Sequence, residues 1–122
     1  MAIEHDDRPW GCYDVVDEGD GFRVKRICIT AGQRLSYQRH SLRAEHWYVV
    51  TGTGVVTLDG DERRVGPGDT VDIVAGAAHR AANPGSHDFV FIEVQTGSYF
   101  GEEDIERLDD DYGRSPVAEP QA

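Results

Sequence analysis

The chain has 122 residues, which is enough for one domain of ordinary size and leaves little room for a second. Its 12 lysines and arginines stand against 23 aspartates and glutamates, and the formal net charge of −11 disfavours a nucleic-acid partner. Hydrophobic residues make up 39% of the chain, yet there is no run of the roughly 18 apolar residues that a membrane helix needs. The composition predicts a folded, soluble, cytoplasmic protein.

Short alternating segments bounded by glycine and proline predict an all-β fold. Alternation with period two places successive side chains on opposite faces of a strand. Many such segments at short intervals are typical of a β-sandwich or a β-barrel. The expected strands cover residues 22–30, 35–40, 45–51, a hairpin at 55–65 that turns at DGD, and then residues 70–74, 79–82 and 89–96.

The composition changes near the end of the chain. Residues 102–122 hold eight acids against two arginines. We expect one short helix over residues 102–108 and a polar, flexible tail over residues 115–122, which contain two prolines. Residues 1–114 are then predicted to form a single domain.

Cys12 and Cys28 are the two cysteines of the chain. Two cysteines are too few for a disulfide framework, and this pair lacks the close CxxC spacing of many metal-binding cysteines. We therefore interpret them as reduced thiols with a structural role.

Four polar residues are the candidates for a metal site. Gln38 and His40 are two positions apart, so they project from the same face of their strand. Glu45 returns on the next strand after a short bend, and His79 ends a glycine-bounded loop that could bring it alongside. An amide oxygen, a carboxylate and two imidazoles suit Zn, Mn, Fe, Co or Ni. His46 follows Glu45 directly and faces the other side of the strand, where we expect it to pack or hydrogen-bond.

These candidates occur within two longer patterns of spaced residues. The pattern G-x5-Q-x-H-x4-E-x6-G covers residues 32–52, and G-x5-V-x-G-x2-H-x3-N covers residues 68–83. Both resemble the two motifs of the cupin superfamily, with Gln38 in place of a histidine and Val74 in place of a proline. The resemblance implies a double-stranded β-helix, a small jelly-roll barrel with a metal in its mouth.

Between residues 8 and 114 the chain is similar to one branch of that superfamily. The stretches RPWGCYDV, LSYQRHSLRAEHWYVVTGTG, FIEVQTGSYFGEEDIERL and DYGR resemble the cupin domain of type II mannose-6-phosphate isomerases. The string QxHxxRxEHW is the most diagnostic part. That family usually carries this domain behind a sugar-phosphate nucleotidyltransferase domain, which has no counterpart in this sequence. We therefore do not expect guanylyl transfer from it.

The resemblance implies interconversion of mannose 6-phosphate and fructose 6-phosphate. This reaction needs a group that moves a proton between C1 and C2 and an electrophile that stabilises the enediolate. A divalent metal, with zinc as the first choice and Mn, Co, Ni or Fe as alternatives, would serve as that electrophile. Glu93 or Lys25 is the candidate for moving the proton. Arg43 or Arg114 is the candidate for holding the phosphate.

Each of these side chains also has a simpler interpretation. Lys25 could lie along the rim of the barrel, Glu93 could form a salt bridge at its end, and both arginines could pair with surface acids. Two other functions stay open. A metal-dependent oxygenase would use Fe(II) in the same barrel and would consume oxygen. A non-catalytic module would bind a sugar or nucleotide sugar around a structural metal.

The expected partner is a small sugar phosphate, with neither nucleic acid nor membrane involved. Trp10, Trp47 and the other strand aromatics are expected to pack in the core or in a dimer interface. An exposed apolar sheet face together with the N-terminal segment RPWG predicts a homodimer, by analogy with other cupins.

Overall fold

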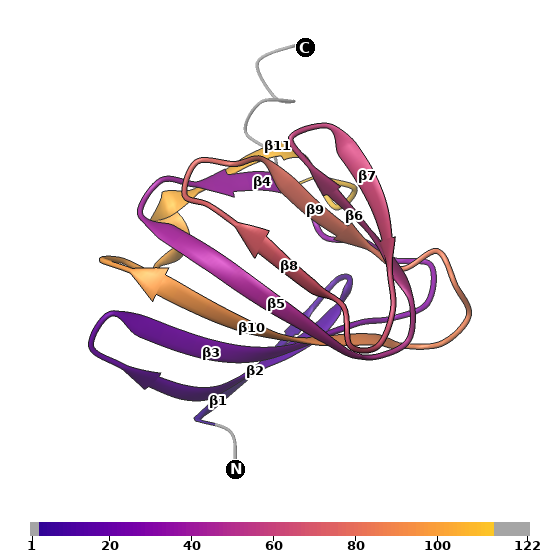
Figure 1. The fold of residues 1–122 in the computed structure, drawn as a ribbon, viewed down its shortest axis with the longest axis horizontal. Coiled ribbons are helices and arrows are strands. Elements are labelled where there is room, and N and C mark those ends of the chain that lie inside the picture. Colours follow the sequence, from indigo (N-terminus) through magenta and orange to yellow (C-terminus); the bar gives the residue numbers. More distant parts are fainter. Residues whose placement is uncertain (1–2, 114–122) are drawn as a thin grey trace.

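The computed structural model describes residues 3–113 and shows two antiparallel sheets that face each other (Figure 1). The six-stranded sheet consists, in spatial order, of β1 (Glu4–Arg8), β2 (Gly11–Gly19), β3 (Phe22–Ile29), β10 (Phe89–Gly97), β5 (Arg43–Thr51) and β8 (Thr70–Ile73). The five-stranded sheet consists of β11 (Ile105–Asp109), β4 (Tyr37–His40), β9 (His79–Ala82), β6 (Gly54–Leu58) and β7 (Asp61–Val65). The predicted all-β jelly roll is confirmed. Arg114 and the predicted tail at residues 115–122 lie outside the described residues.

The apolar core fills one end of the space between the sheets. Trp47 of β5 stacks on Phe91 of β10, with ring centroids 4.5 Å apart, and Phe89 packs against Phe91 at 5.4 Å. These three rings, together with Ile29 of β3, are almost fully buried. Burial of aromatic side chains of this size contributes several kcal/mol to folding.

The inward faces of three neighbouring strands change from apolar to polar at the same level. Along β10 the inward residues are Phe89 and Phe91, followed by Glu93 and Gln95, all of them buried. β3 and β5, which both pair with β10, show the same change. Lys25 of β3 lies opposite Glu93, and Glu45 of β5 lies opposite Gln95. The other end of the barrel is therefore lined by polar and charged groups.

The helix expected over residues 102–108 is wrong in extent. Only Glu102–Asp104 forms a single 3-10 turn, and Ile105–Asp109 is the strand β11, which pairs with β4. Pairing satisfies backbone groups of β4 that would otherwise form an open sheet edge, and this outweighs a local helix preference. Among the described residues, no helix is long and apolar enough to span a membrane.

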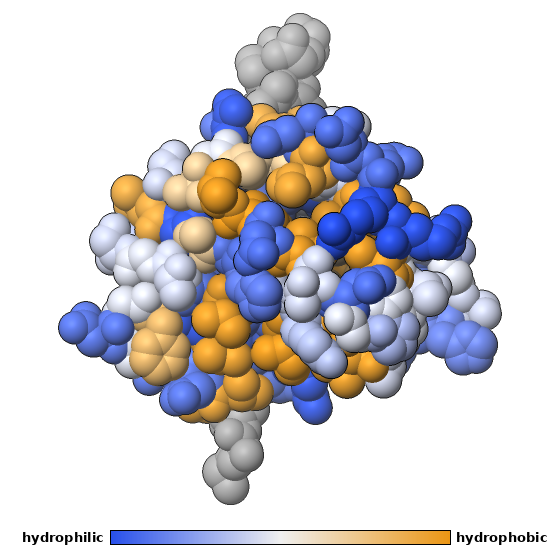
Figure 2. All heavy atoms as spheres, in the orientation of Figure 1, coloured by the Kyte–Doolittle hydropathy of each residue, from blue (hydrophilic) through white to orange (hydrophobic). Residues whose placement is uncertain are grey.

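The outward face of the six-stranded sheet is partly apolar. Tyr48 and Val50 of β5 are exposed, and Ile92 of β10 lies opposite Tyr48 in the sheet. Figure 2 shows apolar atoms gathered over this part of the molecule. A homodimer would bury such a face, and the dimer stays a prediction.

Two loop glycines with positive φ differ in how closely the neighbouring backbone approaches them. Gly52 has a φ of +79°, and a Cβ atom there would lie 2.2 Å from the carbonyl oxygen of Asp88. Gly68 has a similar φ of +89° but faces open space. We expect Gly52→Ala to lower the free energy of unfolding by about 3 kcal/mol or more, because backbone must move. Gly68→Ala should cost about 1–2 kcal/mol, from its conformation alone. Urea denaturation measures both losses, and equal losses would contradict the close approach at Gly52.

Candidate metal centre and adjoining cavity

Three strands bring one carboxylate and two imidazoles together at the polar end of the barrel. His40 is the last residue of β4, Glu45 is the third residue of β5, and His79 is the first residue of β9. Only residues 41–42 separate β4 from β5, so the chain crosses from the five-stranded to the six-stranded sheet within a two-residue bend. All three side chains are buried, and their potential ligand atoms lie within 4.8 Å of one another.

The Glu45 carboxylate lies between the two histidines. Its Oε2 atom is 3.3 Å from His40 Nε2, and its Oε1 atom is 3.7 Å from His79 Nε2. His79 Nδ1 donates to the carbonyl of Ala77 at 3.0 Å, which leaves a lone pair on Nε2. That buried Nε2 has no hydrogen-bond partner among the described residues. An unsatisfied imidazole nitrogen that faces a carboxylate fits a divalent cation such as Zn²⁺.

The two imidazoles have the protonation state that metal binding requires. Burial, and then the charge of Arg43, lower the pKa of His40 to about 3. Burial also lowers the pKa of His79. Both rings are therefore neutral near pH 7, the form in which imidazole coordinates a metal.

Gln38, the fourth candidate ligand, lies beside the cluster. Its backbone pairs with His79 across β4 and β9, and its amide nitrogen is 3.4 Å from His40 Nε2. Its amide oxygen accepts a hydrogen bond from the Ser36 hydroxyl at 2.8 Å. Rotation of the amide by 180° would present the oxygen to the cluster instead.

Arg43, the candidate for phosphate binding, is buried against the cluster. Its Nε donates to Glu45 Oε2 at 2.9 Å, and its Nη2 lies 3.1 Å from His40 Nε2. A third contact joins Nη1 to the carbonyl of Phe100 at 3.3 Å. The guanidinium thus neutralises Glu45 and covers the nitrogen of His40 that a metal would use. A metal bound through His40 Nε2 would replace this contact, and Arg43 also lines the adjoining cavity.

Glu93 is linked to the cluster through a shared donor. Trp47 Nε1 donates to Glu45 Oε1 at 3.0 Å and to Glu93 Oε2 at 3.1 Å. Gln95 Nε2 donates to Glu93 Oε1 at 2.7 Å. Burial, followed by the nearby charge of Glu45, raises the pKa of Glu93 to about 7. A carboxyl group with that pKa is suited to both accept and release a proton at neutral pH.

Lys25 lies on β3 directly opposite Glu93. Its ammonium group is 4.1 Å from the centre of the Tyr13 ring, a distance that allows a cation–π contact. Burial lowers the pKa of Lys25, and the charge of Glu93 opposes that shift. Both candidates for the proton transfer therefore line the same polar space.

A cavity of about 280 Å³ opens beside these residues. Its walls concentrate positive charge, whereas the chain as a whole carries a net charge of −11. Three acids also line it, namely Glu4, Glu93 and Glu102. Five of the chain's 12 basic residues line this cavity, and they are Arg8, Arg23, Lys25, Arg43 and Arg107.

Several of these residues were not among the sequence candidates. Trp47 was expected only to pack, yet its indole nitrogen connects two carboxylates. Arg23 shares the inward face of β3 with Lys25, and that alternation was a usable signal. Arg8 and Arg107 come from the two ends of the chain, and nothing in their sequence context indicates a common cavity. Arg114 lies outside the described residues, so its predicted role stays a prediction.

The shared indole donor can be removed without removing the ring. Trp47→Phe preserves the stack on Phe91 but leaves Glu45 and Glu93 without their common hydrogen bond. We expect Zn²⁺ affinity to fall by about 10-fold to 100-fold, as for other residues that orient metal ligands. Isothermal titration calorimetry measures this, with Trp10→Phe as a matched control on a tryptophan whose ring also lines the cavity. An affinity equal to that of the unchanged protein would show that Trp47 does not orient Glu45.

Comparison with known proteins agrees with this architecture. The model of the family described as mannose-6-phosphate isomerase C-terminal matches residues 3–110. The alginate biosynthesis protein AlgA of Pseudomonas aeruginosa is 52% identical over 113 residues, which cover 93% of this chain and 23% of that protein. The mannose-1-phosphate guanylyltransferase of Escherichia coli is 50% identical over 107 residues, covering 88% and 22% respectively. The chain thus spans less than a quarter of the length of these relatives.

Solved structures support the fold at lower sequence identity. The cupin domain of Cnp3 from Schizosaccharomyces pombe superposes with a TM-score of 0.68 and 11% identity. The match covers 71% of this chain and 64% of that domain, and it shows the shared fold alone. Together, the match over residues 3–110 and the two-sheet barrel show that the chain belongs to the mannose-6-phosphate isomerase C-terminal family and has a cupin-like fold.

Proposed function

We propose that this domain is a metal-dependent mannose-6-phosphate isomerase that interconverts mannose 6-phosphate and fructose 6-phosphate. The observation that carries the proposal is the position of the His40, Glu45 and His79 cluster beside a cavity rich in basic residues. The family description names the same substrate. Cytoplasmic action on a soluble sugar phosphate, by a homodimer, is part of this proposal.

The basic residues of the cavity would bind the phosphate. Several are already paired with acids, since Arg8 lies 2.7 Å from Glu102 and Arg23 lies 3.1 Å from Glu18. Lys25 differs, because no carboxylate lies within 4.0 Å of its ammonium group in the part of the chain that the structure describes. A phosphate dianion would supply that missing counter-charge and offset the cost of burying the ammonium.

A divalent metal would be held by His40, Glu45 and His79, with Gln38 as a fourth ligand. When bound, it would supply Lewis acidity to the substrate oxygens at which negative charge develops. Arg43 would leave its contact with His40 and keep its charge within reach of the cavity. A guanidinium in that place would hold an anionic group through two parallel hydrogen bonds.

Glu93 is the stronger of the two candidates for moving the proton. Its carboxyl group lines the cavity and is held in place by Trp47 and Gln95. A fixed carboxylate could accept the C2 proton of the aldose and return it to C1, while the proton of the O2 hydroxyl passes to O1, so the isomerisation consumes no net protons. Lys25 would then bind the substrate anion rather than shuttle the proton.

The first experiment is a coupled isomerase assay with mannose 6-phosphate, run on chelated protein and after addition of Zn²⁺, Mn²⁺, Co²⁺ or Fe²⁺. We expect turnover with at least one metal, a loss of at least about 100-fold after chelation, and the same loss in His79→Ala. His46→Ala is the matched control, because this exposed imidazole lies on the outer face, where it is hydrogen-bonded to Asp72. Full turnover in chelated protein would contradict the metal dependence, and oxygen consumption would favour the oxygenase.

A second pair of variants separates the roles of Glu93 and Lys25. Glu93→Gln keeps the hydrogen-bonding shape but loses the basic carboxylate, so kcat should fall by about 100-fold to 10,000-fold with little change in KM. Lys25→Met should mainly raise KM for the phosphorylated sugar. Steady-state kinetics measures both, after circular dichroism has confirmed folding. If kcat falls in Lys25→Met and not in Glu93→Gln, the two assignments must be exchanged.

One observation favours non-catalytic binding of a sugar phosphate as a second candidate. Arg43 already neutralises Glu45, so the site can balance its charge without a metal. Calorimetric binding of mannose 6-phosphate by metal-free protein that shows no turnover with any of the four metals would favour this binding module over the isomerase.

A further inference from the structure

A second group of metal-binding side chains lies on the outer face of the six-stranded sheet. Asp7 of β1 lies directly opposite Cys12 of β2, and Cys12 lies directly opposite Cys28 of β3. His5 lies two residues before Asp7 and therefore points to the same side of the sheet. Strand pairing thus places four potential ligands in one patch, although they span 24 positions of the chain.

Three of the four potential ligand atoms are close enough for one ion, and the sulfur of Cys28 lies outside this group. A ring nitrogen of His5, a carboxylate oxygen of Asp7 and the sulfur of Cys12 lie within 4.8 Å of one another. The thiol of Cys28 is close enough to the thiol of Cys12 for the two groups to affect each other's pKa. Burial, the charge of Asp88 and the neighbouring Cys12 together raise the pKa of Cys28 to about 11. Both thiols are free and half-buried.

The His5 ring lies between two carboxylates. Its Nδ1 is 2.6 Å from Asp14 Oδ1, and its Nε2 is 3.0 Å from Asp7 Oδ1. A neutral imidazole carries one N–H, so it can donate to only one of these two acceptors. The second contact needs either an extra proton on the ring or a cation between the nitrogen and the carboxylate.

We propose that His5, Asp7 and Cys12 form a second metal site for one Zn²⁺ ion, and that the thiol of Cys28, which lies opposite Cys12, turns toward the ion as its fourth ligand. This donor set suits zinc, and thiolates favour it over Mg²⁺ or Ca²⁺. Asp14 would orient the imidazole through Nδ1, in the arrangement common behind zinc-bound histidines.

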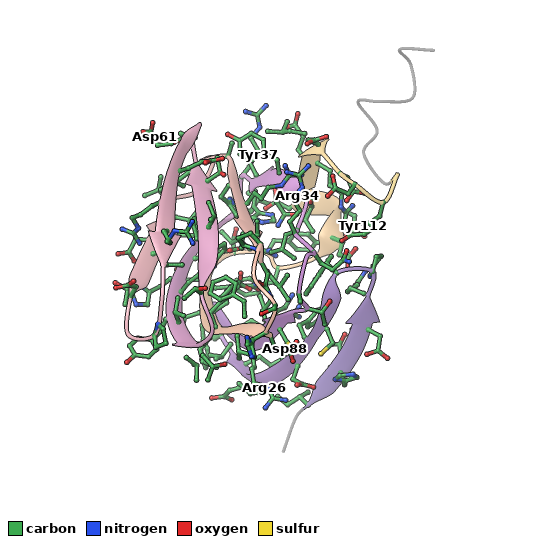
Figure 3. The ribbon with its side chains drawn as sticks, turned by 90° about the vertical axis from the view of Figure 1, so that its right-hand side faces the viewer. Arg26, Arg34, Tyr37, Asp61, Asp88 and Tyr112 are labelled. Carbon is green, nitrogen blue, oxygen red and sulfur yellow. The ribbon has the colours of Figure 1, made fainter. Side chains whose placement is uncertain are left out.

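The charges around the patch are compatible with a cation. Asp14 and Asp88 are acids beside it, and the base Arg26 contacts it through an ion pair with Asp14. Figure 3 shows Arg26 and Asp88 at the same end of the molecule. The net charge of −11 adds a general attraction for divalent cations.

This site is independent of the barrel cluster and of the proposed isomerase activity. Residues Tyr13, Lys25 and Ile27 line the barrel cavity, and they alternate with the members of the patch along β2 and β3. The patch and the cavity therefore lie on opposite faces of β2 and β3, and the barrel cluster lies on other strands, β4, β5 and β9. The barrel cluster contains no sulfur, which allows the two sites to be distinguished by spectroscopy.

Cobalt substitution provides the test. The full chain, kept reduced with a phosphine and shown by thiol titration to carry two free thiols, is titrated with Co²⁺. We expect a near-ultraviolet thiolate-to-cobalt charge-transfer band that saturates at one ion per chain and disappears when Zn²⁺ is added. Cys12→Ser and Cys28→Ser should each weaken Co²⁺ binding at this site by at least about 100-fold. Asp17→Asn is the matched control on β2 and should keep the band.

Other outcomes would overturn the second site. Absence of the band in the unchanged protein would show that His5 holds an extra proton instead of a metal. Undiminished Co²⁺ affinity in Cys12→Ser would show that the ion does not depend on the His5, Asp7 and Cys12 group, because Cys28 is then the remaining thiol of the chain. His79→Ala must leave the band intact, because it removes a ligand of the barrel cluster only. Loss of isomerase activity in that variant with an unchanged band would therefore leave the second site standing.

Discussion

The register of β3, β10 and β5 is the constraint on which the rest of the molecule depends. These strands are paired so that Phe91 lies between Ile27 and Val49, and Glu93 lies between Lys25 and Trp47. The inward-facing residues of each strand change from apolar to polar near this level, so one end of the barrel is apolar and the other is charged. A shift of one residue in β10 would move Glu93 to the outer face and separate it from Trp47.

Glu45 is the carboxylate through which the charged end is organised. It contacts Arg43, lies near both imidazoles and accepts a hydrogen bond from Trp47. A buried carboxylate is costly unless cations or donors surround it. Its negative charge also disfavours ionisation of Glu93, which helps to explain why the second carboxyl group has a pKa of about 7. One buried charge thus positions both the metal-binding groups and the candidate proton carrier.

The sequence was informative where periodicity and spacing carry the signal. Alternation located β3, β5 and β10, and the spacing of His40, Glu45 and His79 anticipated a cluster that the structure brings within 4.8 Å. It failed for the hairpin of β1 and β2 and for β11, whose pairing depends on partners distant in the chain. The contact of Arg43 with Glu45 was also missed. The spacing of residues in the sequence does not show whether an arginine binds a ligand or pairs with a neighbouring carboxylate, because that depends on how the side chains pack.

The alternation of side chains along each strand also explains how so small a barrel separates the basic cavity on its inside from the thiol-containing patch on its outside. On β3 the inward Lys25 faces Glu93, while the outward Arg26 contacts Asp14 and the outward Cys28 lies opposite Cys12. The sheet is only one residue thick, yet its backbone hydrogen bonds leave no polar path through it. Hard oxygen and nitrogen donors with a basic cavity therefore occupy the inside, and thiols with acids occupy the outside. Because one register of β3 holds both sets, a shift of β3 by one position would move Lys25 out of the cavity and separate Cys28 from Cys12.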